Sequence, residues 1–167
     1  MRRFVILAVL VSVTLAVPLR AEDRGPSTLE ERAKALLLVR ALEANPIAPD
    51  APQARKWLST FLISVPDITV QVCGEFMKPL ITSKKDYAAE IFSQSMYSAA
   101  AFVIEHPAEK DNVEARYLAG IEGSLRAYEA LQKYNQTLIW PVLDDLIARR
   151  DAGKLAEFVH QKALACK

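Results

Sequence analysis

The sequence predicts an all-α fold, a single-domain bundle of six or seven short to medium helices after an N-terminal signal peptide. Apolar residues recur at i, i+3 and i+4 along most of the chain, which is the spacing of one helix face. Nine prolines separate these stretches, and a proline inside a helix removes a hydrogen bond and clashes with the preceding turn. The links between the stretches are short, as in helix bundles.

The N-terminal segment 1–21 has the plan of a secretory signal peptide. Arg2 and Arg3 precede an almost unbroken apolar run over 4–17, and Ala21 lies at a plausible cleavage position. The run is shorter than the roughly 20 apolar residues that a membrane span needs. We therefore expect cleavage after residue 21, no stable membrane insertion, and one exported α-helical domain over 22–167, either periplasmic or extracellular.

The first two helices of this domain have start signals. Ser27 and Glu30 have the spacing of a capping box, which predicts a helix over 27–44. Asp50 is placed to cap a second helix that has Pro52 in its first turn. The apolar face expected in that helix contains Ala54, Trp57, Leu58, Phe61, Leu62 and Val65.

Residues 66–79 fit two structures. Ile68, Val70 and Val72 alternate as in a short strand, whereas Ile68, Val72 and Phe76 also fit one face of a helix. We expect a helix, because the neighbouring stretches are helical. Further helices are predicted over 86–106, 111–134, 141–149 and 155–165.

The two cysteines, Cys73 and Cys166, are expected to form a disulfide bond. An even number of cysteines in an exported protein favours pairing, because the compartment is oxidising. The bond would join the penultimate residue to the middle of the chain. No histidine can be assigned to Cys73 from the sequence as the base of a catalytic pair.

Charge and motifs exclude several function classes. The net charge is +1, and removal of residues 1–21 takes away three arginines and no acidic residue, which leaves −2. Nucleic-acid binding needs a clustered basic excess, so nucleic acid is not an expected partner. The sequence has no glycine-rich phosphate loop, nucleophile elbow or His-Glu-x-x-His motif. The leading interpretation is a non-catalytic binding or structural module whose partner is a small ligand or another exported protein.

The predicted binding site is a groove beside a run of small residues in the 86–106 helix. Small side chains let another helix or a ligand approach closely. The groove residues expected are Tyr97, Ser98, Ala99, Ala101 and Tyr128. This hypothesis requires that the run is not covered by other helices of the same chain.

The alternative function is a metal- or haem-binding protein, or an enzyme whose site is assembled only in the fold. Glu157 and His160 have the Glu-x-x-His spacing of di-iron bundles, but the second such pair is missing, since Val103 stands three residues before His106. Met77, Met96 and His160 are candidate haem ligands. We expect no cofactor, because a surface pair of Glu157 and His160 and gap-filling core methionines are the more common explanations of these residues.

Charged residues predict mainly surface pairs. Glu122 with Arg126, and Glu129 with Lys133, have the i, i+4 spacing that stabilises a helix by a few tenths of a kcal/mol. The adjacent Asp144 and Asp145 point about 100° apart on a helix, so they do not form a catalytic dyad by themselves.

Overall fold

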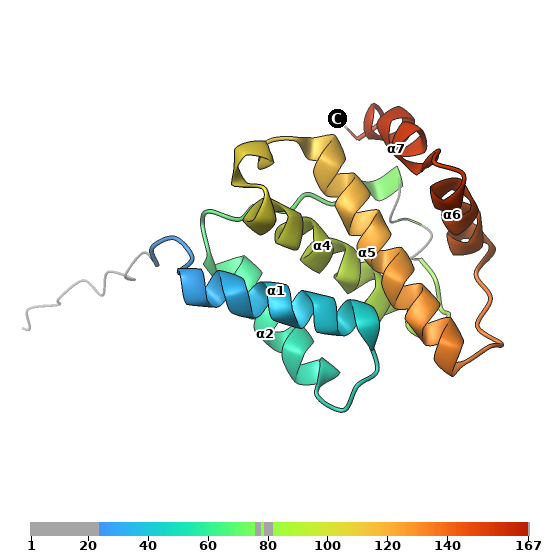
Figure 1. Cartoon of the computed structure of the whole chain (residues 1–167), viewed down its shortest axis with the longest axis horizontal. Helices are drawn as coiled ribbons and strands as arrows, with labels where there is room; N and C mark the ends of the chain where they lie inside the picture. The colour runs from blue at the N-terminus through green and yellow to red at the C-terminus, as the bar shows by residue number, and fades with distance from the viewer. Residues whose placement is uncertain (1–23, 76–77, 79–81, 167) are drawn as a thin grey trace, which may run out of the picture.

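Two long helices, α4 (Ala88–Glu105) and α5 (Val113–Tyr134), pack side by side through the middle of the molecule (Figure 1). The computed structural model describes residues 24–75, 78 and 82–166. The other helices are α1 (Leu29–Ala44), α2 (Ala51–Ser64), α6 (Pro141–Asp151) and α7 (Leu155–Ala163), with a 3-10 turn, η1 (Pro107–Glu109). No strand occurs in these described ranges. The predicted all-α bundle is confirmed.

The core has two parts on either side of the central pair. Helices α1 and α2 pack against α4 and bury Val39, Leu58 and Phe61. Helices α6 and α7 pack against α5, where Leu125 and Val159 are buried. In Figure 1, α1 with α2 and α6 with α7 accordingly lie at different ends of the molecule. No helix within the described residues is both long enough and apolar enough to span a bilayer.

The capping box of α1 lies one residue later than predicted. Thr28, and not Ser27, is the N-cap, because its hydroxyl accepts the N–H of Glu31 at 3.1 Å and the Glu31 carboxylate accepts the N–H of Thr28 at 2.9 Å. The Ser27 backbone N–H and hydroxyl instead donate to Asp67 at 2.8 and 2.7 Å. Ser27 thus ties the start of α1 to the chain after α2.

The prediction of a helix over 66–79 is wrong for residues up to 73. Residues 68–73 form neither helix nor strand. Arg116 of α5 donates hydrogen bonds to the carbonyl of Thr69 and the side chain of Gln71. Long-range hydrogen bonds thus hold a segment that has no regular backbone hydrogen bonding of its own. Helical backbone occurs at Gly74, Glu75 and Lys78, and Met77 lies outside the described residues.

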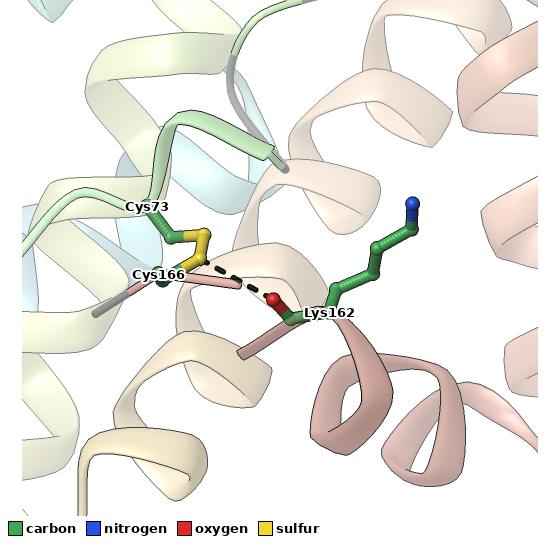
Figure 2. The surroundings of a disulfide bond; sticks show 3 residues. All are labelled: Cys73, Lys162 and Cys166. Carbon is green, nitrogen blue, oxygen red and sulfur yellow. Dashed lines mark hydrogen bonds between the residues drawn. A yellow bond between two sulfur atoms is a disulfide. The ribbon is translucent and has the colours of Figure 1, made fainter. Parts of the chain in front are cut away.

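The Cys73–Cys166 disulfide is present (Figure 2), with the two Cα atoms 5.5 Å apart. It joins the segment after α2 to the segment after α7. Cys73 is buried, and the sulfur of Cys166 lies 3.5 Å from the carbonyl oxygen of Lys162. The bond therefore fastens the last helix to the centre of the fold.

Candidate functional site

The run of small residues in α4 is covered by α5 on one side and by the core that α1 and α2 form on the other, so the groove expected there is filled by the same chain. Every residue predicted to line it is at most 4% exposed: Tyr97, Ser98, Ala99, Ala101 and Tyr128. Two glycines of α5 permit the close approach. A Cβ at Gly120 would lie 2.7 Å from the carbonyl oxygen of Ser95, and one at Gly123 would overlap the side chain of Ser98. Small residues here serve helix packing.

The centre of the actual candidate site is Glu43, near the end of α1, which is not among the residues predicted from the sequence. Its side chain is only 6% exposed. It accepts a hydrogen bond from the Ser98 hydroxyl at 2.7 Å and two from Arg126 at 2.9 Å. Arg40 adds two more at 3.0 and 3.1 Å. One carboxylate thus links α1, α4 and α5.

A second layer of contacts holds these partners in place. Arg40 also donates two hydrogen bonds to Glu105, at 2.9 and 2.7 Å. Gln94 donates to the Ser98 hydroxyl at 3.0 Å and to the carbonyl of Val39 at 3.4 Å. The Nη1 atom of Arg126 lies 3.9 Å from Glu122, so this predicted pair exists but is loose. The strong partner of Arg126 is Glu43.

These contacts keep Glu43 ionised. Burial acts to raise the pKa of Glu43, but hydrogen bonds from Arg126 and Ser98 and the charges of Arg126 and Arg40 outweigh it, so the pKa is lowered. A carboxylate with a lowered pKa is a poor proton donor at neutral pH. Its chemical capacity here is to orient two guanidinium groups.

The network opens into a pocket of about 470 Å³, which we name the Glu43 pocket. It is lined by Arg40, Glu43, Ser98, Phe102, Glu105, His106, Ala119, Glu122 and Arg126. The rings of Phe102 and His106 lie 4.7 Å apart between their centroids and give the pocket an aromatic element. Its volume is within the range of pockets that hold small organic ligands. Ser98 is the one predicted groove residue that borders it.

The predicted metal ligands are not brought together. His160 lies 2.9 Å from Glu114 of α5 and is exposed, while Glu157 accepts a hydrogen bond from Gln161. His106 lies against Phe102 at the end of α4, with the two rings tilted by 35°. Over the described part of the chain, no group of three or more His, Cys, Asp or Glu residues is placed to hold a metal ion. Of the haem candidates, Met96 borders a different, small cavity.

The remaining charged residues behave as structural contacts, with partners partly different from those predicted. Glu129 forms an ion pair with Arg150 of α6 at 2.7 Å, so its partner is on another helix and is not the predicted Lys133 of its own helix. Asp144 accepts a hydrogen bond from the buried Tyr128 hydroxyl at 2.9 Å. Burial is the main cause that raises the pKa of Tyr128 to about 12, and Asp144 adds to it.

The sequence held a weak signal for Glu43. It falls one residue after the buried Leu42 and four after the buried Val39, so a charge stands on the apolar face of α1. Its partners in α4 and α5 lie 55 and 83 positions away, a separation that no local pattern reveals. No protein-family model matches the chain, and neither the curated proteins nor the solved structures contain a significant match.

Proposed function

We propose that the protein is an exported, non-catalytic binding module, and that the Glu43 pocket takes a small zwitterion with an apolar or aromatic body. The observation that carries the proposal is the guanidinium of Arg126, which Glu43 holds fixed at the edge of a ligand-sized pocket.

Arg126 retains hydrogen-bonding capacity for a ligand carboxylate. A guanidinium has five N–H donors, and two of those of Arg126 are directed to Glu43. The side chain is 41% exposed, and Nη1 is too far from Glu122 for a hydrogen bond. A preoriented arginine with donors left over suits bidentate recognition of a carboxylate.

The charge of the pocket argues against a multiply charged anion. Its lining contributes two arginines and three glutamates, so the carboxylates are in excess. The Glu105 and Glu122 side chains are about 36 and 40% exposed and reach the rim. A ligand that carries both an ammonium group and a carboxylate matches this mixture of charges, and Phe102 supplies apolar surface for its body.

Binding without catalysis suits the chemistry of Glu43. General acid–base catalysis needs a group whose pKa lies near the working pH, whereas the pKa of Glu43 is lowered. Export is proposed from the plan of segment 1–21, and the disulfide between Cys73 and Cys166 is compatible with an oxidising compartment.

The ligand class is tested by isothermal titration calorimetry of the purified protein with three probes. L-Phenylalanine has both charges, 3-phenylpropionate lacks the ammonium group, and 2-phenylethylamine lacks the carboxylate. We expect phenylalanine to bind at least tenfold more tightly than either analogue. Equal affinities, or no binding by any of the three, would contradict the proposed ligand class.

Two variants localise the binding. Arg126→Gln removes the guanidinium and is expected to abolish phenylalanine binding, with Arg149→Gln as the matched control. Arg149 pairs at 2.7 Å with Asp145, also at i, i+4 and on an exposed surface, but lies in α6, away from the pocket. Loss of binding in both variants, or in neither, would mean that the pocket is not the site.

Export is tested separately by N-terminal sequencing of the protein recovered outside the cytoplasm. The chain is expected to begin at Glu22. A full-length chain retained in the cytoplasm would contradict export and leave the binding experiment unaffected.

A further inference from the structure

Arg116, near the start of α5, is a buried cation whose hydrogen-bond partners are neutral. The residue is 7% exposed. Its Nη1 donates to the carbonyl of Thr69 at 3.2 Å, and its Nη2 donates to the Oε1 atom of Gln71 at 3.0 Å. The buried Nε atom has no hydrogen-bond acceptor among the described residues.

A small cavity, lined in part by Arg116, lies between α4, α5 and the 71–73 segment. It has about 20 Å³ of space, and its lining includes Arg116, Cys73, Met96, Ala99 and Gly120. Space of about 10–15 Å³ measured in this way accommodates one water-sized particle. The cavity is therefore suited to a single small occupant beside the disulfide.

The charge of Arg116 favours an anion as that occupant. A buried charge is costly unless it is paired, and the described part of the chain provides no carboxylate within 4.0 Å of this guanidinium. Arg32, Arg40, Arg126 and Arg150, by contrast, each contact a carboxylate. A monovalent anion would supply the missing negative charge and would accept the N–H of Nε, which has no partner among the described residues.

We propose that this cavity binds one halide-sized monovalent anion, such as chloride, which accepts the N–H of Arg116 Nε. The anion neutralises Arg116, and the hydrogen bonds of Arg116 to Thr69 and Gln71 join this segment to α5. This site is independent of the Glu43 pocket, since the two share no lining residue.

Bromide provides a direct test, because it resembles chloride and scatters X-rays anomalously. Crystals of the wild-type protein soaked in sodium bromide are expected to show an anomalous peak beside Arg116 Nε. Density for a water molecule at that position, with no anomalous peak, would overturn the proposal.

Thermal unfolding tests the same site in solution. At equal ionic strength, we expect the wild-type protein to have a midpoint a few degrees higher in sodium chloride than in sodium gluconate, whose anion is too large for the cavity. Arg116→Gln should lose this difference.

The matched control is Arg55→Gln. Arg55 also donates to a backbone carbonyl, that of Pro46 at 2.8 Å, but it does not line the cavity. This variant should keep the difference between the two salts. A wild-type midpoint that is equal in both salts would refute the site, and if Arg116→Gln does not fold, the bromide experiment decides.

Discussion

At the scale of single residues, the stability of the α1–α4–α5 contact depends on Glu43 being charged. Its carboxylate receives hydrogen bonds from Ser98, Arg40 and Arg126 in a site that is nearly closed to solvent. Charge-assisted hydrogen bonds are stronger than neutral ones, and they offset the cost of burying the Glu43 carboxylate, which is 6% exposed. The network therefore contributes more to the free energy of unfolding than the exposed ion pairs on the surface do.

Glu43→Gln tests this dependence, because it keeps the shape and removes the charge. We expect the free energy of unfolding in urea to fall by about 2–3 kcal/mol. The comparison is Glu105→Gln, which removes a half-exposed partner of Arg40 and should cost at most about 1 kcal/mol. Equal losses in the two variants would show that burial of Glu43 is unimportant.

Asp67 gives a pH dependence at the same scale. Burial acts to raise its pKa, but hydrogen bonds from Ser27 and Arg32 dominate and lower it to about 2, from an ordinary value of 3.8. A lowered folded-state pKa stabilises the protein above the unfolded-state value, and this stability is lost as the pH falls from about 4 to 2. We expect a loss of about 1–2 kcal/mol after allowance for solvent screening.

Urea unfolding of the wild type and Asp67→Asn across pH 5 to 2 measures this contribution. The wild type should be more stable at pH 5, and the two proteins should converge towards pH 2. Parallel curves would contradict the role of the Asp67 carboxylate.

At the scale of elements, the contact between α4 and α5 depends on two glycines. Gly123→Ala places a methyl group into the Ser98 side chain and against a carboxylate oxygen of Glu43. We expect a loss of about 1–3 kcal/mol from overpacking, measured by urea unfolding. Gly25→Ala is the control, since a Cβ there meets no atom within 4 Å. If Gly123→Ala were as stable as the wild type, α4 and α5 could move apart to fit the methyl group without loss of stability, and the close approach would not matter.

Local patterns predicted most elements because helix faces and proline boundaries are local properties. The α2 face is an example, since Leu58 and Phe61 are buried as the spacing indicated. The irregular 68–73 segment was missed because its hydrogen bonds come from Arg116, which is 47 positions from Thr69. The groove was misplaced for a related reason: small residues in α4 indicate a close neighbour, but not whether that neighbour is a ligand or α5.

At the scale of the whole molecule, the disulfide adds a covalent link between the centre and the last helix. Helix α7 also packs through Leu155 and Val159, so the fold is expected to persist without the bond. The double variant Cys73→Ser/Cys166→Ser should lose about 2–4 kcal/mol, mainly because the unfolded chain gains freedom over a separation of 93 positions. Thermal unfolding measures the loss, and an unchanged midpoint would contradict it.

The main functional proposal for the whole molecule is that the Glu43 pocket binds a ligand. It is tested most directly by two-dimensional ¹H–¹⁵N NMR of the labelled protein during titration with L-phenylalanine. We expect saturable shifts of the backbone amides around Arg40, Ser98, Phe102 and Arg126, with α6 and α7 unaffected. Absent shifts, or shifts confined to other elements, would contradict it.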